Sequence, residues 1–138
     1  MGVRLPVRAL TVVLGPALVR RRLMALLDDT GVRRLDATSA RDPEDRLRLV
    51  DELRAGASAT GPVALVLVDR FTEGLDATDR RRLLRALRDL AAAGPAVLVD
   101  DDDAVAALAV ADRTLCADPV RGLVVEPVST RDLPALVS

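Results

Sequence analysis

The chain has 138 residues, 50% apolar and 30% charged, so it is long and apolar enough to fold as one globular domain over residues 1–138. Its net charge of -1 excludes bulk electrostatic attraction to nucleic acid or to an anionic membrane. It contains no histidine and no lysine, which excludes imidazole acid–base chemistry, Schiff-base catalysis and histidine-ligated metal. The single cysteine, Cys116, cannot form an intrachain disulfide, which suits a reducing compartment.

The N-terminal stretch has a superficial likeness to a targeting segment. Met1–Val19 is rich in apolar residues, but Pro16 interrupts it, and Arg20–Arg22 stand where a signal peptide has a small-residue cleavage site. Gly2 is not followed by serine or threonine at the sixth position, which argues against myristoylation. No apolar run approaches the roughly 20 residues that cross a bilayer, so we expect a cytoplasmic protein without direct membrane insertion.

The first half of the chain alternates short apolar runs with helical patterns. The expected elements are an edge strand over Val3–Val7, a buried strand over Leu10–Leu14, a helix over Ala17–Leu27, a strand over Val32–Asp36 after a Thr30-Gly31 turn, a helix from the N-cap Asp42 to Gly56, and a loop over Ala57–Gly61. The positions expected to face the core are Leu18, Leu23, Leu26 and Leu27 of the first helix and Leu47, Val50 and Leu53 of the second.

The second half repeats this alternation and ends in a hairpin pattern. The expected elements are a strand over Val63–Val68 ending in Asp69, a helix starting at Thr78 or Asp79 with Leu83, Leu84, Leu87 and Leu90 inward, a strand over Ala96–Val99 that runs into Asp100–Asp103, a helix over Ala104–Ala111, a hairpin of Thr114–Ala117 and Gly122–Glu126, and a short helix over Arg131–Val137. Strands alternating with helices predict an α/β fold of three layers, with a mostly parallel sheet between flanking helices.

Several stretches resemble, in order and in spacing, the motifs of ATP-binding-cassette ATPases of the P-loop NTPase superfamily. They are Leu10–Pro16 for the Walker A strand and loop, Thr30–Ala37 for the following strand, Leu65–Asp69 for Walker B, Gly74–Asp76 for the D-loop, Val97–Asp103 for the switch-histidine loop, and Ala111–Leu115 for the closing part. The resemblance implies a P-loop core. It also implies that the strand ending at Leu14 lies between those ending at Asp69 and Asp100.

The catalytic positions of that family hold other residues here. Arg21 falls nearest the Walker A lysine, Arg22 replaces the magnesium-binding serine or threonine, and Arg70 replaces the catalytic glutamate. The switch histidine falls on Asp102, or on Asp101 if the alignment shifts by one. Only 45 residues run from Ala17 to Gly61, too few for the helical subdomain and its signature motif. The resemblance therefore implies a degenerate, catalytically inactive relative.

Three functions are compatible with these residues. We favour a regulatory, scaffolding or interaction subunit that pairs with itself, with a competent ATPase subunit or with a membrane transporter component. The alternative is a nucleotide-binding subunit that holds ATP and Mg²⁺ weakly. We expect no nucleic-acid partner for either function. The third is a metal-dependent enzyme that uses Asp69 and Asp100–Asp103. The degenerate cofactor-binding residues implied by the resemblance are Gly15, Pro16, Arg21, Asp69 and Asp102.

The acids at the two strand ends are expected to share one edge of the sheet, and like charges that close need compensation. The hypotheses are ion pairs with Arg20–Arg22 and Arg70, a metal ion at Asp69 or Asp102, or plain solvation. Four residues of the Walker B and D-loop region are candidate interface positions: Arg70, Phe71, Gly74 and Asp76. Phe71 can instead belong to the core, and Asp76 can cap the following helix.

Two further features have alternative interpretations. Arg80–Arg82 are either a solvated face or contacts to a partner's acidic groove, and Cys116 is expected to be inert core.

Overall fold

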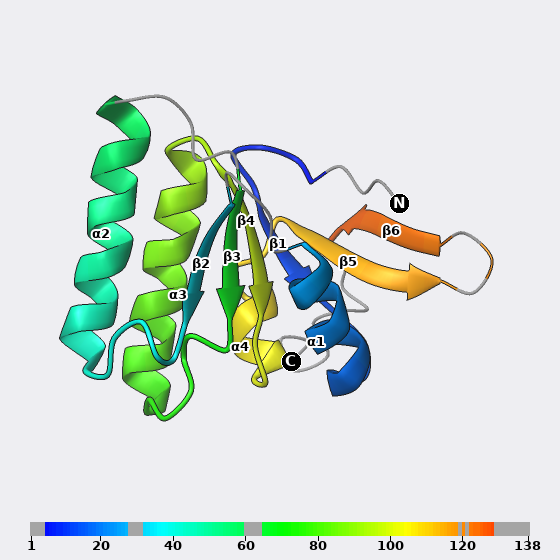
Figure 1. Cartoon of the computed structure of the whole chain (residues 1–138), viewed down its shortest axis with the longest axis horizontal. Helices are drawn as coiled ribbons and strands as arrows, with labels where there is room; N and C mark the ends of the chain where they lie inside the picture. The colour runs from blue at the N-terminus through cyan, green and yellow to red at the C-terminus, as the bar shows by residue number, and fades with distance from the viewer. Residues whose placement is uncertain (1–4, 28–31, 60–64, 119, 121, 129–138) are drawn as a thin grey trace, which may run out of the picture.

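The computed structural model describes residues 5–27, 32–59, 65–118, 120 and 122–128, drawn in colour in Figure 1. Strands and helices alternate along the chain, as the apolar periodicity predicts. Their order is β1 (Leu10–Val13), α1 (Ala17–Leu26), β2 (Val32–Asp36), α2 (Pro43–Ala59), β3 (Leu65–Asp69), α3 (Ala77–Ala92), β4 (Ala96–Asp100), α4 (Ala104–Leu108), β5 (Arg113–Asp118) and β6 (Gly122–Pro127).

The strands form one six-stranded sheet in the order β2-β3-β4-β1-β5-β6. The neighbours from β2 to β5 run parallel, and β6 pairs antiparallel with β5 as the expected hairpin. The helices lie on both faces of this sheet (Figure 1), so the α/β, mostly parallel, three-layer architecture is confirmed.

Two hydrophobic clusters hold the layers together, one on each face of the sheet. The larger cluster joins leucines of α2, α3 and α4 to Leu10, Val66 and Val97 of the sheet. The smaller cluster joins Leu23 and Met24 of α1 to the opposite face of the strands. Successive side chains of a strand point to opposite faces, so the same strands supply both clusters.

The implied strand order was wrong, because β4 and not β1 lies beside β3. Asp69 of β3 is paired in register with Asp100 of β4, and β1 lies on the far side of β4. The physical reason is the short crossover through α3, which returns the chain next to the strand it has just left. The acids at the two strand ends are therefore direct neighbours across the sheet.

The inward face expected for α1 was partly wrong. Leu23 and Met24 are buried, but Leu18 and Leu26 are 70% and 71% exposed. At 3.6 residues per turn, the helix that packs Leu23 and Met24 against the sheet turns Leu18 and Leu26 toward solvent. In α3, by contrast, all four expected leucines are buried, and the Asp76 carboxylate caps the helix by accepting from the Asp79 N–H at 2.8 Å.

Other boundaries also differ from the sequence prediction. Helix α4 ends at Leu108, where a helix through Ala111 was expected, and the chain turns at 109–110. Helix α2 continues through 57–59, where a loop was expected, because alanine and serine do not stop a helix as Gly61-Pro62 would. Val7 and Arg8 form a turn in place of the expected edge strand. Four predicted features lie outside the described residues: the Thr30-Gly31 turn, the rest of the expected loop, residues 3–4 of the edge strand, and the helix over Arg131–Val137. Among the described residues, no helix has the length and apolar character to cross a membrane.

Candidate functional site

The carboxyl ends of β3 and β4 bring two buried acids side by side. Asp69 and Asp100 are partners in the β3–β4 register and are only 4% and 1% exposed. The expectation that Asp69 and the Asp100–Asp103 run share one edge is confirmed. Two neighbouring carboxylates at this depth require positive charge beside them.

Arg20 supplies that charge to Asp100. It extends from the first turns of α1, and its guanidinium forms an ion pair with the Asp100 carboxylate and lies 3.5 Å from that of Asp102. Its Nε also donates to the Gly15 carbonyl at 2.9 Å, so the side chain lies across the loop between β1 and α1. Burial nevertheless raises the pKa of Asp100 above its ordinary value, although Arg20 favours the charged form.

Two arginines cover the Asp69 carboxylate. Arg34 of β2 forms an ion pair with its Oδ2, and the Arg70 Nε lies 3.1 Å from its Oδ1. Arg70 has a positive φ of 52°, a conformation that non-glycine residues adopt only at a cost, and its N–H donates to the Asp100 carbonyl at 2.7 Å. Sequence reasoning missed Arg34, although its place on a strand running into the same edge was a usable signal.

Of the three hypotheses for this edge, its geometry therefore matches the ion pairs with arginines. Arg20 and Arg70 take part as expected, whereas Arg21 and Arg22 are exposed and form no ion pair with any described residue. Asp102 is the exposed member of the edge, with 59% of its side chain accessible. Over the described ranges, no three carboxylate or thiol groups converge in a way that could hold a metal ion.

A second polar cluster lies behind the first, toward α3 and α4. Asp101 is 4% exposed and accepts from the Thr72 hydroxyl at 2.6 Å and from the Asp103 N–H at 2.8 Å. Arg80 lies 3.3 Å from the Asp103 carboxylate and donates to the Thr72 hydroxyl and the Leu75 carbonyl. Burial raises the pKa of Asp101, and its hydrogen bonds oppose that shift. Arg80 is therefore half-buried and hydrogen-bonded within the chain, and not part of a solvated face. Arg81 and Arg82 are exposed, as expected.

Phe71 belongs to the core, so its assignment as an interface candidate was wrong. It is 0% exposed, because the loop after β3 turns it inward under α2. Arg46 of α2 lies over its ring at 5.9 Å and donates to the carbonyls of Phe71, at 3.0 Å, and Glu73, at 2.7 Å. Arg46 is itself only 6% exposed, and its helical spacing alone gave no sign of this role.

The other predicted positions lie at the surface. Gly74 is exposed with φ 82°, a left-handed conformation that favours glycine, and Asp76 is exposed beside it as the α3 cap. Gly15 and Pro16 border a mostly apolar hollow of about 470 Å³ that also contacts Cys116. Cys116 is therefore half-buried at the wall of this hollow, and the expectation that it lies in the core was wrong.

Comparison with known proteins places this geometry in a fold. No protein-family model and no curated protein matches the chain. Among solved structures, it is similar to CbiO1 from Clostridium perfringens, described as part of the ABC transporter complex CbiONQ, with a TM-score of 0.54 and 11% identity over 92% of this chain and 80% of that one. At this identity the likeness shows the fold alone: a mostly parallel α/β sheet like that of an ABC transporter protein.

Proposed function

We propose that this chain is a non-hydrolysing, cassette-like domain that acts through protein contacts as a regulatory or scaffolding subunit. The observation that carries the proposal is the arginine pairing of the carboxyl edge, where Arg20 pairs with Asp100 while Arg34 and Arg70 pair with Asp69. This edge is where open parallel sheets place their ligands, so its occupation by internal ion pairs argues for a different use of the fold.

The residues present do not fit a magnesium triphosphate. Magnesium needs carboxylate or hydroxyl oxygens that are free to coordinate it, whereas both carboxylate oxygens of Asp69 and Oδ1 of Asp100 face arginines. A phosphate loop needs open space in front of its backbone N–H groups, and here the Arg20 side chain lies across the loop, donating to the Gly15 carbonyl. The Walker A motif also uses a lysine to contact the phosphates, and the chain has no lysine.

Calorimetric titration with ATP, with and without Mg²⁺, tests the proposal. A ligand present at 100 times its Kd would stabilise the fold by about 2.7 kcal/mol, so thermal shift measured in parallel detects even weak binding. We expect neither heat of binding nor a shift in melting temperature. Magnesium-dependent binding of ATP to the wild-type chain would refute the proposal.

An Arg20→Ala variant, which empties the space beside Gly15, sharpens this experiment. If the arginine alone excludes nucleotide, the variant gains ATP binding. If the whole edge is unsuited, the variant binds no better than wild type. Arg33→Ala is the matched control, because Arg33 is an exposed arginine of β2 without an ion pair to any described residue.

A second candidate function is a nucleotide-binding subunit that holds ATP weakly. The likeness of the fold to CbiO1, part of an ABC transporter complex, favours it. The same likeness supports a transporter component or a competent ATPase chain as the partner in the favoured function. Light scattering of the purified chain tests the homodimer, which we expect if the D-loop residues Gly74 and Asp76 meet a second copy. The single cysteine is consistent with a cytoplasmic setting for either function.

A further inference from the structure

An apolar groove lies between helices α3 and α4, on the face of the sheet opposite α1. Its volume is about 400 Å³, enough to admit side chains of a bound segment and within the range of small-molecule pockets. Buried Leu84 and Val110 form part of its floor, and Val105 on α4 is 47% exposed beside them. The groove therefore offers contiguous apolar surface that the fold itself does not cover.

The charges that border this α3–α4 groove set it apart from the rest of α3. The helix carries five arginines, of which Arg80, Arg82 and Arg88 form ion pairs with Asp103, Asp79 and Asp112. The remaining two, Arg81 and Arg85, are exposed, line the groove, and have no acidic partner among the residues that the structure describes. Four residues apart on one helix, they lie one above the other on the same face.

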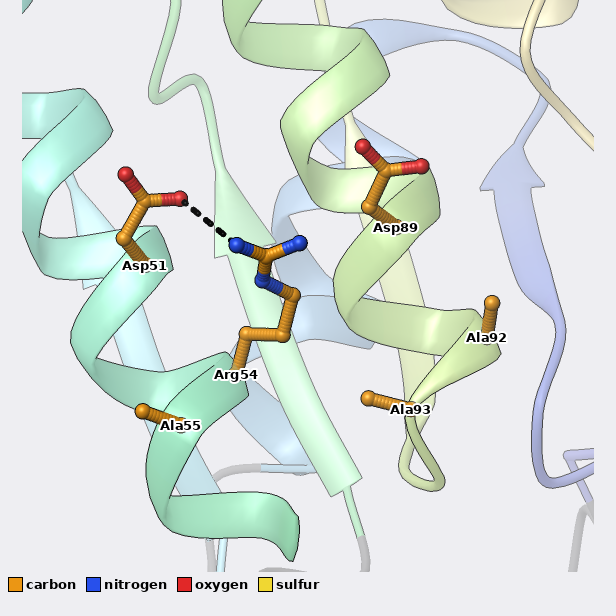
Figure 2. Close-up of a pocket in the computed structure, with 6 residues that line it drawn as sticks. All are labelled: Asp51, Arg54, Ala55, Asp89, Ala92 and Ala93. Atoms are coloured by element: carbon orange, nitrogen blue, oxygen red, sulfur yellow. Dashed lines mark ion pairs between the residues drawn. The ribbon is translucent and has the colours of Figure 1, made fainter.

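A larger hollow between α2 and α3 provides a contrast. It has a volume of about 660 Å³, and Figure 2 shows Arg54 reaching from α2 toward α3 with Asp51 and Asp89 on either side. There the arginine lies 3.9 Å from Asp51, and the other lining residues are alanines that offer little apolar surface. There the arginine has an acidic partner within the chain, whereas Arg81 and Arg85 of the α3–α4 groove have none among the described residues.

We propose that the α3–α4 groove is a docking site for an acidic, amphipathic segment of a partner protein. Two like charges one helical turn apart repel each other, and here they border a groove of contiguous apolar side chains, a combination that the packing of the fold does not use. A partner carboxylate beside each arginine would relieve the repulsion, and an aliphatic side chain would fill the apolar floor. The inference deepens the proposed interaction function by naming the chemistry of the partner.

The geometry also specifies the partner segment. Arginine binds carboxylates through paired N–H groups, so two acids spaced three or four residues apart on a helix match Arg81 and Arg85. A leucine, isoleucine or methionine on the same helix face would enter the groove beside Leu84 and Val105. At the other end, Asp103 already faces Arg80 at 3.3 Å, so a carboxylate is disfavoured there and the segment has one preferred direction.

Selection from a displayed library of helical peptides of about 15 residues, on the full chain, tests the proposal. We expect enrichment of peptides with two acids three or four residues apart beside an aliphatic residue. Fluorescence anisotropy then compares a selected peptide on wild type and on the R81E/R85E and V105D variants, each of which should weaken binding about tenfold or more. A peptide with lysine in place of its acids should prefer R81E/R85E to wild type.

The matched control is R33E/R41E, which makes the same charge change at two exposed arginines far along the chain from the groove. It should leave the affinity of the selected peptide within about twofold. Binding that R81E/R85E weakens no more than R33E/R41E overturns the proposal. A selection that enriches no acidic sequences also overturns it. If single-stranded DNA then binds wild type and not R81E/R85E, the groove is a phosphate site instead. Neither outcome alters the ATP titration, so the two proposals fail separately.

Discussion

At the carboxyl edge of the sheet, the buried carboxylates of Asp69 and Asp100 each contact an arginine, whereas in the α3–α4 groove the exposed Arg81 and Arg85 contact no carboxylate of the described chain. Burial explains the difference, because a charge removed from water must be paired, while a charge left in water need not be. The edge pairs are therefore needed by the fold. The groove arginines are not, and this leaves them available to a partner.

The largest effect should come from breaking the most buried pair. Asp100→Ala leaves Arg20, whose side chain is 13% exposed, with only the more distant Asp102, and we expect a loss of about 3 kcal/mol in the free energy of unfolding. Urea denaturation measures it. Asp89→Ala, at an exposed acid of α3, is the control and should change stability by less than about 0.5 kcal/mol. Equal effects of the two variants would contradict the idea that burial distinguishes the two regions.

The next effect concerns the loop that joins the two regions. Arg46→Ala removes the guanidinium that binds the carbonyls of Phe71 and Glu73, and we expect a loss of about 2 kcal/mol. Hydrogen exchange should show faster exchange at the Leu75 N–H, which donates to the Thr72 carbonyl within this loop. Arg48→Ala, at an exposed arginine of the same helix, should do neither. Unchanged exchange at Leu75 in Arg46→Ala would show that the loop holds its shape without this anchor.

A smaller effect is expected from the pH dependence of Asp101. Its pKa is raised in the folded state, chiefly by burial. Its contribution to stability is therefore fully present below the unfolded pKa of about 3.9 and is lost as the pH rises through the folded value. Asp101→Asn cannot ionise, so between pH 4 and neutrality its stability should fall less than that of wild type. Denaturation at a series of pH values measures the difference, and parallel curves would rule out this role for Asp101.

The smallest effect compares neighbouring arginines of α3. Arg81→Gln removes one member of the unpaired couple, and we expect a gain of about 0.3 kcal/mol from the lost repulsion. Arg82→Gln removes an arginine that lies 3.3 Å from Asp79 and 3.4 Å from Glu44, so it should lose a similar amount. Thermal unfolding at low and high salt should show both changes shrinking with ionic strength. A gain for both variants would mean that the exposed pairs of α3 are not favourable.

Much of the fold could be predicted from the sequence because its signals are local. The apolar run ending at Asp69 became β3, the four leucines of α3 are buried, and Asp76 caps that helix. Each of these depends on residues within a few positions of one another, where period and capping chemistry decide the outcome. The placement of Asp69 and Asp100 at one edge follows from the same reasoning, since parallel strands end together.

The sequence by itself determined that strands alternate with helices, that acids end two of the strands, and that no histidine or lysine chemistry is possible. Only the tertiary structure decided that β4 lies beside β3, that Arg20 rather than Arg21 reaches the edge, and that Arg34 and Arg46 take part. The reason is that an ion pair depends on the rotation of a helix against a sheet and on which strands are neighbours. Both are set by packing between residues far apart in the chain.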